Sequence, residues 1–258
     1  NVNSYGKDRR KQGEVDFAGL IRKVAAVTGV ERVRFTTSHP MDCNDTLIEA
    51  FGDVPELMPW FHLPIQSGSP RVLRMMRRSH GVDDYLARID RLRTLRPNIA
   101  MTTDIICGFP GETEEDHQLT LRLLEQVRYS SIYSFMYSER PGTAAARIED
   151  DVPLATKKRR LAEVQALQGE ITNAWMAGFA GREVEVLFEG RSTLTKAGPA
   201  SKRAAARLFG PPQVMGRTPE NIKVNIDATD PEAMTLWPGR RARVRVTGRL
   251  RRLPPADN

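Results

Sequence analysis

The sequence is poor in cysteine, with Cys43 and Cys107 as the two such residues in 258. Small secreted proteins held by disulfides carry more cysteines at closer spacings, so this count favours a reducing compartment. An iron–sulfur cluster or a structural zinc ion needs three or four ligands close together. We therefore expect no metal site, and no cluster, to be built from this sequence alone.

Long apolar runs are missing as well. No stretch approaches the roughly 20 residues needed to span a bilayer. The first residues are not basic and no apolar segment follows them, unlike a secretory signal. We expect a cytoplasmic, monomeric protein without a membrane partner. Because the sequence begins with Asn1 rather than Met, we also expect it to be truncated at the front.

The net charge of +7 is concentrated in the last third of the chain. Residues 1–180 contain 24 Lys and Arg against 24 Asp and Glu, whereas residues 181–258 contain 15 against 8. A basic module beside a neutral body is typical of a protein that binds a polyanion such as RNA. The alternative is a solvated basic surface without a partner.

Hydrophobic periodicity predicts strands and helices in alternation as far as residue 178. The expected strands are 33–37, 60–65, 99–107 and 131–137. The expected helices lie at 17–27, 45–51, 70–76, 85–95, after Thr113 and at 161–175. Ser69 and Thr113 are suitable N-caps. Strands separated by helices of this length form parallel βαβ units, so the fold class is α/β.

The pattern changes near residue 180, where we place a domain boundary. Residues 183–189, 222–226 and 243–246 alternate apolar and polar side chains, as strands of a small antiparallel β-barrel do. Residues 191–220 are rich in Gly, Pro, Ser and basic residues, and we expect them to be a loop. The two predicted domains are therefore 1–180 and 181–258.

Polar or glycine-rich segments follow each expected strand of the first domain, at 38–40, 66–69, 108–112 and 138–143. Because parallel strands end on the same side of a sheet, these segments should meet in one ligand site. Each also has a simpler interpretation as a tight turn or a helix cap. His39 and His62 are interpreted as packed or capping residues, and Cys107 as a buried apolar residue.

Five motifs in order resemble the radical-SAM methylthiotransferase family. They are NVNSYG at 1–6, RVRFTTSHP at 32–40, HLPIQSGS at 62–69, GFPGETEED at 108–116 and YSERPGT at 137–143. The resemblance implies a partial parallel (βα) barrel lacking its first strand and cluster loop. It also implies that residues 181–258 are similar to the TRAM domain, an RNA-binding β-barrel. The implied reaction is methylthiolation of N6-isopentenyladenosine next to the tRNA anticodon, by S-adenosylmethionine radical chemistry.

The resemblance also implies site residues. Those expected to bind S-adenosylmethionine are Asn1, Asn3, Ser38, Gln66, Ser67 and Gly108. Those expected on the side of the tRNA anticodon stem-loop are Tyr137, Arg140, Arg240, Arg241, Arg243 and Arg245. The family binds two 4Fe–4S clusters through cysteines that this sequence lacks. We therefore expect no catalytic residue here, and no activity from this polypeptide alone.

Three other functions remain possible at this point. Two are methylthiotransferases that act on a ribosomal protein or on threonylcarbamoyl-adenosine. Ser67-Gly68 and Ser69 differ from what those branches tend to carry, which favours the isopentenyladenosine branch. The third is an RNA-binding fragment without catalysis, which agrees with the missing cysteines.

Overall fold

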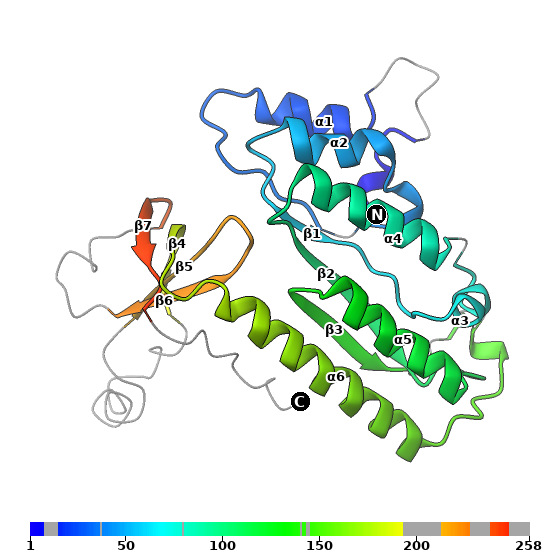
Figure 1. Cartoon of the computed structure of the whole chain (residues 1–258). Coiled ribbons are helices and arrows are strands. Elements are labelled where there is room, and N and C mark those ends of the chain that lie inside the picture. Colours follow the sequence, from blue (N-terminus) through cyan, green and yellow to red (C-terminus); the bar gives the residue numbers. More distant parts are fainter. Residues whose placement is uncertain are drawn as a thin grey trace. The chain divides into compact units, whose positions relative to one another are not determined.

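The computed structural model describes residues 1–7, 15–36, 38–78, 80–139, 141–142, 145–192, 213–227 and 238–247. The chain divides into two compact units, Asn1–Trp175 and Met176–Asn258 (Figure 1). Each unit has its own sheet. Among the described helices, none is both long and apolar enough to cross a membrane.

The first unit contains a parallel sheet of β1 (Trp60–His62), β2 (Ala100–Cys107) and β3 (Ser131–Met136), in that order. Phe61 is opposite Met101 in one pair, and Ile106 is opposite Phe135 in the other. A single bridge between Gln66 and Ile105 continues the pairing beyond the end of β1. The predicted parallel α/β arrangement is confirmed.

The expected strand at 33–37 is wrong. Val33 makes one parallel bridge, to Leu57, and the neighbouring described residues do not continue it. The chain turns tightly at Pro59, where the Trp60 N–H donates to the Met58 carbonyl at 2.7 Å. That bond uses the donor that the next step of a parallel ladder would need, so the pairing stops after one step.

The described part of the chain contains six α-helices, and Figure 1 shows α4, α5 and α6 running beside the strands of the parallel sheet. The helices are α1 (Phe17–Ala25), α2 (Asp45–Asp53), α3 (Pro70–Met75), α4 (Val82–Leu95), α5 (Glu114–Val127) and α6 (Leu154–Ala177). Both predicted caps are confirmed: Ser69 Oγ accepts from Val72 N–H, and Thr113 and Asp116 form a capping box.

The two faces of the parallel sheet differ in burial. Phe61, Ile105 and Ile132 lie in the hydrophobic core with the apolar sides of the helices. The opposite face is less covered: Ala100 and Thr102 are buried there, but Trp60, His62 and Asp104 are half-buried, and Tyr133 and Phe135 are 58% and 54% exposed. Alternation along each strand therefore gives one apolar face to the core and leaves the other accessible.

The second unit contains an antiparallel sheet in the order β6-β5-β4-β7. Its strands are β4 (Glu183–Arg191), β5 (Gln213–Arg217), β6 (Lys223–Asp227) and β7 (Arg241–Arg245). β5 corrects the prediction that residues 191–220 form a loop, and residues 193–212 lie outside the described residues. Antiparallel pairing is confirmed, but these four strands do not close into a barrel within the described part of the chain.

Candidate functional site

The accessible face of the parallel sheet borders a cavity of about 450 Å³. Its aromatic lining comes from Trp60, His62 and Tyr133. Its polar lining comes mainly from Asn1, Ser38, Gln66, Arg78 and Asp104. These residues are far apart in sequence and are brought together by the parallel strands and by the turns that follow them. The cavity therefore combines flat apolar walls with groups of both charges.

Three of the six residues expected to bind a cofactor, Asn1, Ser38 and Gln66, line this cavity. Asn3 lies behind it. The Asn3 amide donates to the His39 carbonyl and accepts from the His39 N–H, both at 2.9 Å. Asn3 thus fixes the N-terminal turn to the segment that carries Ser38. Asn1, Ser38 and Gln66 thus lie around one cavity, and their binding of a cofactor stays a prediction.

Gln66 has a left-handed backbone, with φ of +81°. Non-glycine residues rarely adopt this conformation, and its cost is tolerated where the surroundings hold it in place. Here the Gln66 N–H donates to the Asp104 carbonyl, and the Gln66 carbonyl accepts from the Ile106 N–H, both at 2.9 Å. β2 therefore holds this strained residue in the wall of the cavity.

Ser38 supplies a hydroxyl that lacks a partner. The residue is 4% exposed, and its Oγ makes no hydrogen bond within the described structure. Buried polar atoms are nearly always hydrogen-bonded, so an orphan in a cavity wall suits a ligand that completes it. The residue was selected from its place after an expected strand, although that strand does not form.

Arg78 and Asp104 put opposite charges on the cavity wall. Burial lowers the pKa of Arg78, and the nearby Asp104 carboxylate opposes that shift. Asp104 Oδ1 also lies 3.5 Å from His62 Nε2, while His62 Nδ1 lies 3.0 Å from Thr102 Oγ1. Burial lowers the pKa of His62, again against Asp104. A ligand with an ammonium and a carboxylate finds a counter-charge for each.

Ser67 and Gly108 are not among the residues that line the cavity. Ser67 is fully buried, and its Oγ accepts from the Ser69 N–H at 3.1 Å. The Gly108 N–H donates to Glu112 Oε2 at 2.6 Å. A Cβ on Gly108 would lie 2.3 Å from Lys157 Cγ, so a glycine is needed where that side chain crosses. Both residues support loops next to the cavity.

Tyr137 also lies outside the cavity lining. Its ring packs edge-on against Phe109 with centroids 5.2 Å apart, and Lys157 Nζ lies 5.3 Å from its centre. Arg140, the other predicted substrate residue of this segment, lies outside the described residues.

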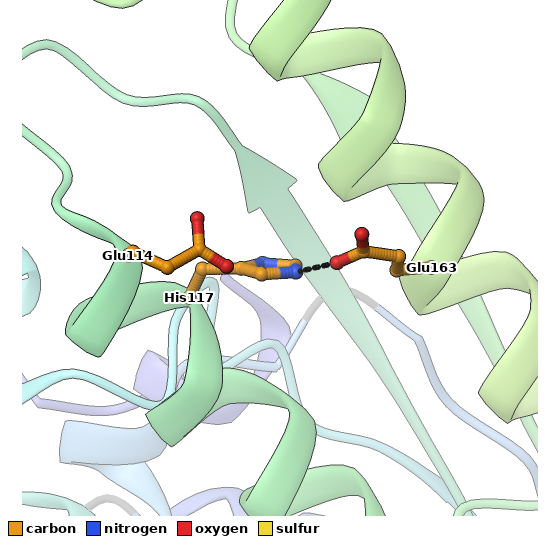
Figure 2. A group of neighbouring side chains, drawn as sticks. All are labelled: Glu114, His117 and Glu163. Atoms are coloured by element: carbon orange, nitrogen blue, oxygen red, sulfur yellow. Dashed lines mark hydrogen bonds and ion pairs between the residues drawn. The ribbon is translucent and has the colours of Figure 1, made fainter.

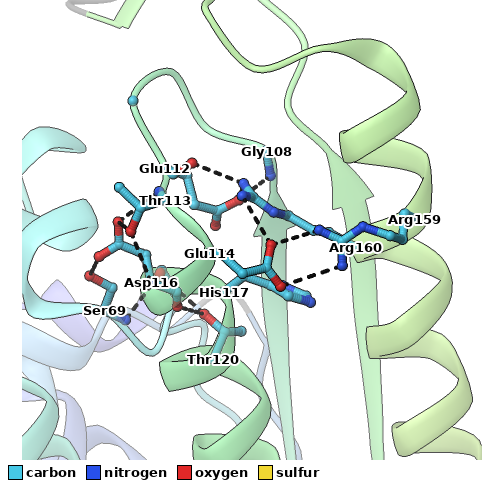
Figure 3. A network of polar contacts seen from close by, with 12 residues as sticks. Ser69, Gly108, Glu112, Thr113, Glu114, Asp116, His117, Thr120, Arg159 and Arg160 are labelled. Atoms are coloured by element: carbon cyan, nitrogen blue, oxygen red, sulfur yellow. Dashed lines mark hydrogen bonds and ion pairs between the residues drawn. The ribbon is translucent and has the colours of Figure 1, made fainter.

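A polar network, shown in Figure 3, fixes the loops after β1 and β2 to the helices. Asp116 accepts hydrogen bonds from Ser69, Arg71 and Thr113. Burial alone would raise the pKa of Asp116, but these bonds outweigh it and lower the pKa well below its usual value. The carboxylate therefore stays ionised and joins the caps of α3 and α5.

Glu112 and Arg160 form a second, buried part of this network. Their side chains are 2% and 5% exposed, and Arg160 donates to Glu112 Oε2 at 2.9 Å. Burial raises the pKa of Glu112, and the Gly108 N–H and Arg160 oppose that shift. The pair attaches α6 to the loop after β2.

Glu114, His117 and Glu163 bring three potential metal-ligand atoms within 4.8 Å of one another (Figure 2). His117 Nε2 lies 2.7 Å from Glu163 Oε2. The Arg159 guanidinium, however, donates to both carboxylates, at 2.6 Å and 2.7 Å. It supplies the positive charge that a cation would bring, so we interpret the cluster as an ion-pair contact between α5 and α6.

The four arginines expected to bind RNA lie on or next to β7 in the second unit, and all four are exposed. Two of them face acidic partners on β4: Arg241 lies 3.6 Å from Glu185, and Arg245 lies 3.1 Å from Glu183. Arg240 and Arg243 have no ion pair within the described residues. Acidic side chains of β4 thus offset part of this basic strand.

Sequence reasoning did not select Trp60, Arg78 or Tyr133 as site residues. Trp60 and Tyr133 were assigned to strands, but no signal in the pattern said which face of the sheet would stay accessible. Arg78 follows α3 and reaches the cavity only through the folded loop. Asp104 lies within the expected strand at 99–107, and it is also one of the lining residues.

The radical SAM superfamily profile matches residues 10–124. A tRNA-2-methylthio-N(6)-dimethylallyladenosine synthase of Myxococcus xanthus is 50% identical over 234 residues, which are 90% of this chain and 46% of the relative. Enzymes of the same name from Chromohalobacter salexigens and Anaeromyxobacter sp. (strain K) are 43% and 46% identical, over 90% and 96% of this chain and 48% and 49% of their own length. The chain belongs to the radical-SAM methylthiotransferase family. It spans about half the length of the curated relatives it matches.

Among solved structures, the coproporphyrinogen III oxidase of Escherichia coli, described as a radical SAM enzyme, matches with a TM-score of 0.46 and 18% identity. The match covers 72% of this chain and 39% of that one. The family assignment rests on the sequence relatives.

S-adenosylmethionine fits the residues that are present. The orphaned Ser38 hydroxyl, Arg78 and Asp104 line one cavity. A 4Fe–4S cluster does not fit them, because it is held by several clustered thiolates. Cys43 and Cys107 are buried on different elements, and burial raises the pKa of each thiol to about 12. Two buried thiols far apart in the sequence do not make the clustered set that an iron–sulfur cluster needs.

Proposed function

We propose that this chain is the cofactor-binding and RNA-binding portion of a tRNA methylthiotransferase that modifies N6-dimethylallyladenosine next to the anticodon. The names of relatives that are 41–50% identical over most of this chain support the reaction and its substrate. A tRNA substrate would place the reaction in the cytoplasm. The second unit, which we propose completes a TRAM-like barrel, would contact the anticodon stem-loop through β7.

The cavity supports the proposed cofactor. S-adenosylmethionine would supply the hydrogen-abstracting radical that an unactivated aromatic C–H requires. Arg78 would bind its carboxylate and Asp104 its ammonium, while Ser38 and Gln66 would bind remaining polar groups. The observation that carries the proposal is the convergence of Asn1, Ser38 and Gln66 on one cavity. Two 4Fe–4S clusters would have to be bound by cysteines outside this sequence.

The test is titration of the chain with S-adenosylmethionine by isothermal calorimetry. We expect binding, and we expect Ser38→Ala to weaken it about fivefold, because one net hydrogen bond of about 1 kcal/mol is lost. Thr94→Ala is the matched control: its hydroxyl bonds the Asp90 carbonyl within α4, away from the cavity. No detectable binding, or equal affinities for the two variants, would contradict the proposal.

A further inference from the structure

Three aromatic side chains from the accessible face of the sheet line the cavity. Trp60 and His62 project from the same face of β1, and their rings are nearly parallel, at 12°, with centroids 6.4 Å apart. The two rings are therefore stacked with nearly parallel faces. Tyr133, from β3, stands at 82° to the His62 ring, with centroids 5.9 Å apart. We call the part of the cavity beside these three rings the slot.

The slot is accessible to a ligand. Tyr133 is 58% exposed, although a residue of this type normally buries most of its ring. Trp60 and His62 are half-buried. Burial lowers the pKa of His62 below its ordinary value, so its ring is neutral at pH 7 and presents a flat aromatic surface. Flat aromatic surfaces beside polar groups are the usual seat of a nucleobase, because every base has a π-face.

We propose that Trp60, His62 and Tyr133 form a stacking seat for a purine base, with the base against the accessible faces of these rings. This inference rests on the proposed function, which names two sources of such a base. One is the adenosyl group of S-adenosylmethionine, and the other is the adenosine of the tRNA. The cavity volume of about 450 Å³ is of the size of ordinary small-ligand pockets.

The experiment follows Trp60 fluorescence in the chain, with Trp175→Phe and Trp237→Phe removing the other two tryptophans. The titrants are S-adenosylmethionine, 5′-deoxyadenosine and N6-isopentenyladenosine. A base stacked on Trp60 is expected to quench its emission. Tyr133→Ala should weaken binding about tenfold, the size of effect seen when one stacking ring is removed. Tyr133→Phe, which keeps the aromatic ring, should bind with the affinity of the parent chain.

Phe135→Ala is the matched control. Phe135 lies two residues further along the same face of β3 and is equally exposed at 54%, but it does not line the cavity. The Phe135→Ala variant should bind the nucleosides with the affinity of the parent chain. The titrant whose affinity falls most in Tyr133→Ala identifies the source of the base. Thermal unfolding of each variant shows whether the fold is intact. Loss of an exposed side chain should change the unfolding temperature little.

Two results would overturn the seat: unchanged affinity in Tyr133→Ala for every titrant, or equal weakening by Phe135→Ala. If S-adenosylmethionine still bound in a Ser38-dependent manner, the proposed function would survive that failure. Conversely, purine nucleosides that quench Trp60 in a chain that binds neither S-adenosylmethionine nor tRNA would support the seat and contradict the proposed function. The two proposals therefore fail separately.

Discussion

The Asp116 carboxylate links the N-terminal caps of two helices. It belongs to the capping box of α5, and it also accepts from Ser69, the cap of α3, and from Arg71. Ser69 and Thr113 could each be predicted as caps from the sequence, because capping depends on residues three positions apart. The link between them could not, since it joins residues 47 positions apart.

Asp116→Asn should lower the free energy of unfolding by about 1–3 kcal/mol at pH 7, because buried donors lose a charged acceptor. The folded-state pKa of Asp116 is lowered, so its contribution is complete above about pH 4 and is lost as the pH falls below that value. Urea unfolding at pH 7 and pH 3 should therefore show a smaller difference between parent and variant at pH 3. Asp90→Asn, at an exposed position, should show no such convergence. A pH-independent difference would contradict the assignment.

Among the secondary-structure elements, α6 is held to the loop after β2 by the buried Arg160–Glu112 pair. Arg160→Met should lower the free energy of unfolding by about 3 kcal/mol, because Glu112 keeps a buried charge without its partner. Adding Glu112→Gln should recover part of that loss. Arg159→Met is the matched control: its ion pairs are nearly half exposed, so its loss should lower the free energy of unfolding clearly less than Arg160→Met does. Equal losses in urea unfolding would show that burial of the pair does not matter.

The predicted helices and strands agree with the structure where the local sequence pattern determines them. They disagree where pairing with other strands determines them. The long helices and the strands near 60, 100 and 131 follow from periodicity and caps. Residues 33–37 look like a strand, but a turn at Pro59 removes the hydrogen bond that would extend the pairing. β5 lies in a segment of loop-like composition, and it forms a strand because β4 and β6 pair with it. Pairing with neighbouring strands can thus override the intrinsic secondary-structure propensity of a segment.

Across the whole molecule, the sequence predicted Asn1, Ser38 and Gln66 among the residues that line the cavity, but not most of the others. The rule that parallel strands end on one side of a sheet applies to Gln66, which follows β1, whereas Asn1 and Ser38 reach the cavity without a described strand before them. Trp60 and Tyr133 come from inside strands rather than from the turns after them. Their accessibility depends on which face the helices cover, and strand periodicity alone does not say which face that is.

The charge of the second unit leads to a prediction about RNA. Arg240→Ala with Arg243→Ala should weaken binding of a tRNA anticodon stem-loop and lower the slope of log affinity against log salt, because phosphate contacts release counterions. Glu183→Gln with Glu185→Gln should strengthen binding, since these side chains pair with Arg245 and Arg241. Fluorescence anisotropy over a salt series measures both effects. Affinities and slopes that match the parent chain would contradict an RNA surface on β7.

Gly68 has a consequence for how the wall of the cavity responds to a ligand. A methyl group on this residue would lie 2.5 Å from the Leu119 carbonyl oxygen, so the backbone after β1 is in close contact with the backbone of α5. The Gly68 N–H also donates to Thr120 Oγ1 at 3.0 Å. The segment that carries Gln66 therefore packs closely against the backbone of α5, which restricts its movement. This wall of the cavity should therefore keep the same backbone with and without a ligand.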